Sequence, residues 1–305
     1  MPLLIVPANS AVESGNDNGI FGYGATWPAY SDATNIVSNT GVVATDVSGI
    51  GTARAYVAGC EYGGDKGIFA YGAASPGTYT GVTNLVSNTG VVSADVAAVG
   101  QARNQNAGCS YGGDKGIFGY GYNSPAGGYM SMTNLISNTG VMGTDVTGVG
   151  TARRYLGACE YGTDTALFGY GGSGSGMESM TNLVSNTGVV GTDVTGVGTV
   201  RNQVGACAYG GDKGIFGYGG VPGSVSMTNL VSNTGVVATD TTGVGTARSR
   251  VGATQYGGDL GIFAYGAAGP SNSNLSNLVS NTGVVATDTS GVGTARQDPG
   301  SCSYN

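Results

Sequence analysis

The sequence predicts an all-β fold, a single six-bladed β-propeller with four-stranded blades. Three markers repeat six times along the 305 residues with a period of about 48 residues, as expected of a propeller. They are the phenylalanine of an aromatic run, an Asn-Thr-Gly turn and an arginine. The sets are Phe21, Phe69, Phe118, Phe168, Phe216 and Phe263; the turns beginning at Asn39, Asn88, Asn138, Asn186, Asn233 and Asn281; and Arg54, Arg103, Arg153, Arg201, Arg248 and Arg296.

One unit, between Arg201 and Arg248, shows how four strands arise. Four runs in it are rich in apolar, β-branched or aromatic residues, or alternate polar with apolar side chains as half-buried strands do. We expect strands over 204–209, 214–218, 228–232 and 236–240. Tight turns follow the first and third runs, where glycine allows positive φ. No stretch has a helical period, and 60 glycines in the chain oppose helix formation.

The end of the chain is predicted to close the ring. The pattern of the first strand has a good sixth copy at 296–304, whereas residues 10–15 are a poor copy. An open blade edge would promote aggregation, so we expect the last strand to pair beside Gly19 to Tyr23 in the first blade. The predicted domains are an N-terminal arm over 1–14, which packs outside the ring or docks onto a neighbour, and a propeller over 15–305. Its repeat units end near the six marker arginines.

The composition excludes several classes of function. A net charge of −7 argues against a surface that binds nucleic acid phosphates. Histidine is absent, which removes the usual general base and metal ligand. The cysteines each lie two residues before a tyrosine of the repeat, which indicates small buried side chains rather than disulfides or a metal site. They are Cys60, Cys109, Cys159, Cys207 and Cys302. We therefore expect no enzymatic activity, no cofactor and no metal.

Membrane insertion and secretion by a signal peptide are not expected. No apolar run reaches the ~18 residues that a membrane helix needs. Residues 1–7 are apolar, but they are too short and lack the basic start of a signal peptide.

An aspartate precedes each marker arginine by eight residues. This fixed offset predicts a structural pair, or a turn bracket between blades, because charge-assisted hydrogen bonds fix geometry. The alternative is a ring of carboxylates that binds Ca²⁺, although one aspartate per unit gives few oxygen ligands at one place. The residues are Asp46 and Arg54, Asp95 and Arg103, Asp145 and Arg153, Asp193 and Arg201, Asp240 and Arg248, and Asp288 and Arg296.

Variation among the six copies indicates a binding surface. The turns after the first and third strands hardly vary, whereas the loop after the second strand and the residues just after the arginine do. These variable segments emerge on one face of an up-and-down blade, and loops on a rigid scaffold carry function. Aromatic side chains there suit a sugar or a protein partner, and neutral drift is the alternative. The candidate binding residues are Trp27, Tyr30, Tyr56, Tyr79, Tyr122, Tyr129 and Tyr155.

The unit resembles the kelch repeat. Arg201, the run Ile215-Phe216-Gly217-Tyr218-Gly219-Gly220, Asn229-Leu230 and the turn at Asn233 match its arginine, glycine pair, third strand and turn. Two features depart from kelch proteins. The glycine pair is usually Gly-Tyr-Gly, and the tryptophan of the fourth strand is missing. The resemblance therefore implies a kelch-like propeller and carries over no kelch partner.

The repeated sequence is also similar to arrays in virion proteins of tailed, especially marine, bacteriophages. The similar stretches are YGGDKGIFGYG at 209–219 and MTNLVSNTGVVATDTTGVGTAR at 227–248, together with the start of the chain, residues 1–11. The resemblance implies a structural protein of the tail fibre, tail tip or baseplate, made in the host cytoplasm and placed in the virion. It would act in assembly, in host-surface attachment or in both. Its partners would be other virion proteins, reached through residues 1–14, and a host surface glycan or protein. The alternative is a free carbohydrate-binding lectin.

Overall fold

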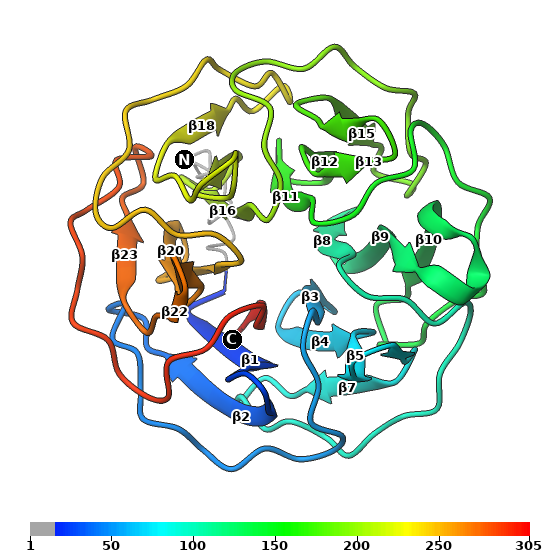
Figure 1. Cartoon of the computed structure of the whole chain (residues 1–305), viewed down its shortest axis with the longest axis horizontal. Coiled ribbons are helices and arrows are strands. Elements are labelled where there is room, and N and C mark those ends of the chain that lie inside the picture. Colours follow the sequence, from blue (N-terminus) through cyan, green and yellow to red (C-terminus); the bar gives the residue numbers. More distant parts are fainter. Residues whose placement is uncertain (1–15) are drawn as a thin grey trace, which may run out of the picture.

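The computed structural model describes residues 16–305, which form an all-β, propeller-like structure. In these residues six three-stranded antiparallel sheets lie around a central axis (Figure 1). The 3-10 helix η1 (Ser124–Ala126) is the one helical element of the described part. The predicted arm over 1–14 lies outside the described residues.

Each sheet has an inner strand near the axis, a middle strand and an outer strand. In that order they are β24 (Gly300–Tyr304), β1 (Asn18–Ala25) and β2 (Tyr30–Val37); β3 (Ala58–Tyr62), β4 (Lys66–Ala70) and β7 (Thr83–Val86); β8 (Ala107–Tyr111), β9 (Lys115–Asn123) and β10 (Gly128–Ile136); β11 (Gly157–Tyr161), β12 (Thr165–Gly169) and β15 (Thr181–Val184); β16 (Gly205–Tyr209), β17 (Lys213–Gly217) and β18 (Thr228–Val231); and β19 (Gly252–Tyr256), β20 (Leu260–Ala264) and β23 (Ser276–Val279). Small hairpins between middle and outer strands are β5 (Ala73–Ser75) with β6 (Thr78–Tyr79), β13 (Gly172–Ser173) with β14 (Gly176–Met177), and β21 (Ala267–Ala268) with β22 (Ser271–Asn272).

The predicted fourth strand over 236–240 is not a strand in the structure. This stretch and its counterparts join the outer strands only through isolated bridges. Asn229 in β18 accounts for the interruption, because its side-chain amide donates to the carbonyl of Ala238 and to the carboxylate of Asp240, both at 2.9 Å. A side chain thus replaces a backbone donor. The predicted four-stranded blades are three-stranded sheets with a bridged outer segment.

A tyrosine with positive φ, between 61° and 65°, follows each marker phenylalanine by two residues. Left-handed backbone costs an L-residue about 1–2 kcal/mol. Each tyrosine ring packs against the phenylalanine of the adjacent sheet, with ring centroids 5.1 to 5.8 Å apart. The guanidinium of a marker arginine lies 4.0 to 4.8 Å from the centre of the same ring. These contacts offset the strain. The tyrosines are Tyr23, Tyr71, Tyr120, Tyr170, Tyr218 and Tyr265.

The cysteines fill narrow gaps between neighbouring sheets. All five are buried and free of disulfides. A Cβ built on Gly116 would lie 2.5 Å from the sulfur of Cys60, and one built on Gly214 would lie 2.5 Å from the sulfur of Cys159. At these two positions a methyl group would overlap the sulfur unless the backbone shifted. The side chains therefore act as small core residues.

The end of the chain supplies the inner strand of the first sheet. β24 pairs antiparallel with β1, with Tyr304 opposite Asn18 and Gly300 opposite Gly22. This is the pairing that the sequence predicts.

Two circles of backbone hydrogen bonds join the six sheets. At one end, the amide of the second residue after each marker arginine donates to the carbonyl of its counterpart in the neighbouring sheet, at 2.8 to 3.4 Å. At the other end, amides of the glycine turns and of Asn305 donate to aspartate carbonyls of the next turn, at 2.7 to 3.0 Å. We call the first end, with the loops between middle and outer strands, the loop face. The second end is the turn face.

Candidate functional site

Cavities follow the inner strands from the loop face to the turn face. At the loop face, a cavity of about 80 Å³ is lined by the second and third residues after each marker arginine. A cavity of about 40 Å³ lies among the inner-strand cysteines. A cavity of about 300 Å³ opens at the turn face. The two ends of the ring therefore offer different surfaces to a ligand.

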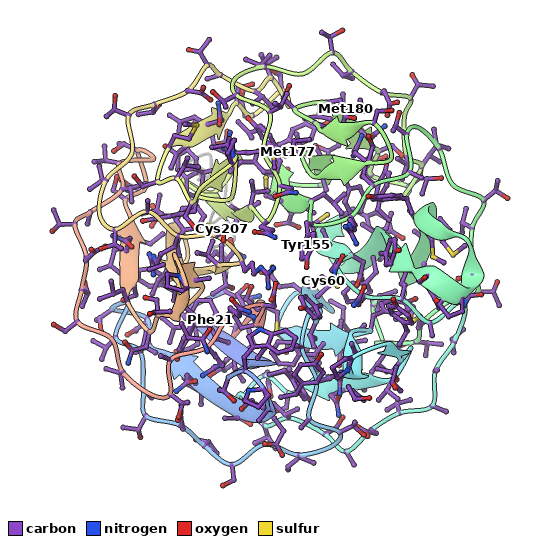
Figure 2. The ribbon with its side chains drawn as sticks, viewed as in Figure 1. Phe21, Cys60, Tyr155, Met177, Met180 and Cys207 are labelled. Carbon is purple, nitrogen blue, oxygen red and sulfur yellow. The ribbon has the colours of Figure 1, made fainter. Side chains whose placement is uncertain are left out.

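Five of the predicted binding residues form an aromatic cluster on the loop face. Ring centroids lie 6.4 Å apart for Tyr79 and Tyr122, 5.4 Å for Tyr122 and Tyr129, and 6.0 Å for Tyr56 and Tyr155. The guanidinium of Arg154 connects the two groups, because it lies 4.6 Å from the ring of Tyr122, 5.2 Å from that of Tyr129 and 5.6 Å from that of Tyr155. Figure 2 shows Tyr155 near the centre of the ring of sheets.

Trp27 and Tyr30 lie beside each other at the edge of the same face. Their ring centroids are 5.6 Å apart, and Trp27 is 44% exposed. With its amide placed so that Oε1 faces Trp27, Gln297 accepts from the indole N–H and, at 3.1 Å, from Arg250. The structure therefore brings together all seven predicted aromatic residues at one end of the ring, in two neighbouring groups.

A charged pair lies between these groups. Arg250 approaches Asp298 at 3.4 Å, and the Asp298 side chain is almost wholly buried. Burial raises the pKa of Asp298 to about 7, although the positive charge of Arg250 opposes the shift. Burial, and next the negative charge of Asp298, raise the pKa of Tyr56 to about 12. Both phenol and carboxyl thus sit where polar groups are poorly hydrated.

The aromatic prediction missed the polar residues of this face: Arg154, Arg250, Gln297 and Asp298. Each directly follows a marker arginine or lies one residue further on, in the segment that differs from copy to copy. That variation was the available signal. Only the structure shows that these side chains lie between the aromatic rings.

The marker arginines and aspartates form a structural network, with a pairing that differs from the one the offset of eight residues suggests. Five of the six marker arginines approach an aspartate of the following unit, as Arg54 does with Asp95 at 3.8 Å and Arg201 with Asp240 at 3.8 Å. Arg296 meets Asp46 at 3.7 Å across the junction of the first and last units. The pairs therefore connect adjacent units. For Arg248 the guanidinium instead donates to backbone carbonyls and to Asn277.

Each arginine of this network is fully buried. Arg201 donates to the carbonyl of Tyr218 at 2.9 Å and to the amide oxygen of Asn229 at 2.7 Å. Asp240 accepts from Asn229 and from Thr199 of the preceding unit. Desolvation works against ionised Asp240, but these hydrogen bonds hold its pKa below the ordinary value. The network holds the units in register.

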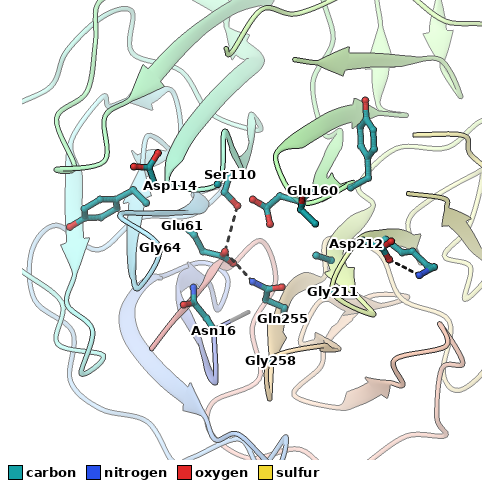
Figure 3. A pocket seen from close by; sticks show the side chains of 16 residues that line it. Asn16, Glu61, Gly64, Ser110, Asp114, Glu160, Gly211, Asp212, Gln255 and Gly258 are labelled. Atoms are coloured by element: carbon teal, nitrogen blue, oxygen red, sulfur yellow. Dashed lines mark hydrogen bonds and ion pairs between the residues drawn. The ribbon is translucent and has the colours of Figure 1, made fainter. Parts of the chain in front are cut away.

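The turn-face cavity contains a group of polar side chains that the sequence interpretation did not single out (Figure 3). Glu61 in β3, Ser110 in β8, Glu160 in β11 and Gln255 in β19 all line it. They occupy one position of the repeat, between the cysteine (or threonine) and the tyrosine of the inner strand. The residues on either side hardly vary, so variation at this position was the signal that could have found them.

Comparisons with known proteins support the fold and leave the family open. No family model matches the chain, and no curated protein matches it. Among 209 matching chains of solved structures is the structure of YjhT, with a TM-score of 0.62 and 10% sequence identity. The match covers 83% of this chain and 90% of that one. At this identity the similarity concerns the fold alone.

Two features are absent from residues 16–305. No helix there is long and apolar enough to cross a membrane. No group of three or more histidine, cysteine, aspartate or glutamate side chains in that range has the geometry to hold a metal ion.

Proposed function

We propose that the chain is a six-bladed, kelch-like propeller that serves as a non-enzymatic binding protein, with the aromatic cluster of the loop face as its ligand surface. The observation that carries this proposal is a cluster of five tyrosines, three of which lie 4.6 to 5.6 Å from one guanidinium, Arg154. Aromatic rings offer apolar faces together with hydroxyl groups, and they bind at low entropic cost. A rigid ring of sheets holds them in place.

Unpartnered amides beside the cluster favour a carbohydrate as the ligand. Asn104, Gln105, Asn106 and Asn123 each have a buried side-chain oxygen or nitrogen without a hydrogen-bond partner among the described residues. The backbone of Asn104 bridges to Tyr122, and Gln105 and Asn106 line the loop-face cavity. Buried polar groups of this kind call for a partner. Sugar hydroxyls both donate and accept, and the ring of a sugar packs against an aromatic face.

The resemblance to phage arrays supports a place for this binding protein in a virion. We propose a component of the tail fibre, tail tip or baseplate that acts in assembly and in attachment to the host surface. Residues 1–14 would bind a neighbouring virion protein. A free lectin with the same loop face is the alternative, and the same carbohydrate chemistry supports both.

A glycan array tests the ligand surface. The purified protein is expected to bind a subset of surface glycans, and Tyr122→Ala and Tyr129→Ala should each weaken binding about tenfold, equal to about 1.4 kcal/mol. Lys115→Ala on the turn face is the control, because Lys115 lies away from the cluster and should bind as the parent protein does. Binding that the tyrosine substitutions leave unchanged would reject the aromatic cluster as the site.

Mass spectrometry of purified phage particles distinguishes a virion component from a free lectin. Peptides of this chain in the particles support the virion component. Glycan binding by a chain that particles lack supports the free lectin.

A further inference from the structure

The turn-face cavity holds two carboxyl groups that converge on one hydroxyl. Ser110 Oγ donates to Glu61 Oε2 at 3.5 Å and is also within hydrogen-bond reach of the Glu160 carboxyl. Figure 3 shows the three side chains directed toward the same part of the cavity. Glu61 comes from β3 and Glu160 from β11, so the third sheet lies between theirs. Their meeting depends on the closed arrangement of inner strands.

Neutral polar groups complete the floor of the cavity. Gln255 Nε2 donates to Glu61 Oε2 at 3.1 Å, and the hydroxyl of Ser303 donates to Glu61 Oε1. Asn16 Nδ2 in turn donates to Ser303 Oγ at 3.1 Å. Glu61 is thereby fixed in position, whereas among residues 16–305 Glu160 has only the Ser110 hydroxyl within hydrogen-bond reach. Within the described part of the chain, one carboxyl group is thus held and the other has room for a ligand.

Basic side chains at the rim are already engaged. Lys213 lines the cavity and lies 2.5 Å from Asp212, and Lys115 lies 2.8 Å from Asp114. The two glutamates therefore have no basic partner among the described residues that line the cavity. Burial, and next the charge of Glu61, raise the pKa of Glu160 to about 8. Burial also raises the pKa of Glu61.

One residue that lines the same cavity carries an unpartnered amide oxygen. Asn16 lines it and is only 3% exposed, and its Oδ1 has no hydrogen-bond partner within residues 16–305. An acceptor left without a donor in a buried position is costly and needs an explanation. A positively charged ligand would supply what both the amide oxygen and the carboxylates lack.

We propose that the turn-face cavity is a binding site for a small cation, held by Glu61, Glu160 and the amide oxygen of Asn16. Two sources share this chemistry. Ca²⁺ prefers carboxylate, amide and hydroxyl oxygens. A primary ammonium group needs acceptors in the same places, and about 300 Å³ is room enough for a short alkyl amine. The site lies at the opposite end of the inner strands from the aromatic cluster and does not depend on it.

Isothermal titration calorimetry of the full chain, after dialysis against a chelator, tests the site with CaCl₂ and with putrescine as separate probes. At least one probe is expected to bind, and the one that binds identifies the source. Glu160→Gln and Glu61→Gln should each weaken binding tenfold or more. Glu178→Gln is the matched control, because it removes a carboxylate that bonds to Ser173 on the other face.

The pH dependence gives a second readout. Affinity should rise between pH 6 and pH 9, because a cation and a proton compete for Glu160. The charged and titratable groups that line the cavity together with Glu160 are Glu61, Asp114, Asp212, Lys213, Tyr62 and Tyr161. Absence of heat with both probes at pH 9 would overturn the proposal. So would binding that the two glutamate substitutions leave intact while the proteins remain folded by circular dichroism.

Discussion

At the scale of single residues, the marker arginines are the most heavily constrained side chains. Arg201 lies over the ring of Tyr170 at 4.2 Å, donates to Asn229 and Tyr218, and approaches Asp240. A guanidinium can serve all of these partners at once because it is planar and has five donors. An ammonium group is a compact point charge and cannot reproduce the stacking. Arginine is therefore required by geometry and not only by charge.

Arg201→Lys is expected to destabilise the fold by about 3 kcal/mol, the cost of breaking a buried charged network. The midpoint of urea unfolding, followed by tryptophan fluorescence, measures the change. Arg154→Lys is the control, since Arg154 also lies over aromatic rings but is half-buried on the loop face, where such a contact is worth about 0.5–1 kcal/mol. Equal shifts for the two proteins would contradict a special role of the buried network.

Glu160 should make the stability of the protein depend on pH. Folding raises its pKa from 4.5 to about 8, so the native state favours the protonated acid. The contribution of protonated Glu160 to the stability of the native state is complete below pH 4.5 and is lost as the pH rises through 8. Glu160→Gln should therefore raise the melting temperature relative to the parent protein at pH 9, with a difference that shrinks toward pH 4.5.

Differential scanning calorimetry from pH 4.5 to 9 measures this difference. Glu178→Gln serves again as the control. A Glu160→Gln protein that is less stable than the parent at pH 9 would show that the carboxylate is stabilised in the native state, against the expectation.

At the scale of secondary structure, alternation and turn chemistry were enough to predict three strands of each unit. The strands expected over 204–209, 214–218 and 228–232 correspond to β16, β17 and β18 within one or two residues. The expectation over 236–240 failed because Asn229 competes with the backbone for the carbonyl of Ala238. Strand propensity does not account for a side chain that takes the place of a backbone hydrogen-bond donor.

Packing between neighbouring sheets depends on pairs of small residues, and one pair can be tested. A Cβ added to Gly67 in β4 would collide with the sulfur of Cys302 in β24. Gly67→Ala should therefore cost about 1–3 kcal/mol, the usual cost of overpacking. Ala166 occupies the equivalent position in β12. The backbone of a sheet can therefore be placed to accept a methyl group at this position. We expect the cost of Gly67→Ala to lie near the lower end, about 1 kcal/mol.

The double substitution Gly67→Ala/Cys302→Ala removes the colliding sulfur. Its loss of stability should be smaller than the sum of the two single losses by about 0.5 kcal/mol or more, because the two residues touch. Urea unfolding of the four proteins measures this difference. Additive losses would mean that the methyl group and the sulfur do not collide.

At the scale of the whole molecule, the repeat predicted the pairing of the chain end but not what the ring encloses. The good copy at 296–304 was a local pattern and could be read directly. The convergence of Glu61 and Glu160 could not, because these residues are 99 positions apart in the sequence and meet only through the curvature of six sheets. For the same reason the partner of Arg296 is Asp46, near the other end of the chain. Closure of the ring of sheets brings residues from distant positions in the sequence close together.

A chain that ends at residue 299 tests how much the ring depends on its last strand. It keeps Asp298 and the loop-face circle of hydrogen bonds but lacks β24, so β1 loses its inner partner and presents an open edge. We expect it to aggregate during size-exclusion chromatography and to unfold at a lower urea concentration.

The matched control ends at residue 304. It keeps β24 and loses only the bond from Asn305 to Asp65, worth about 1 kcal/mol. If both chains elute as the parent does and unfold at the same midpoint, the loop-face circle of hydrogen bonds and the remaining sheets hold the ring without its closing strand.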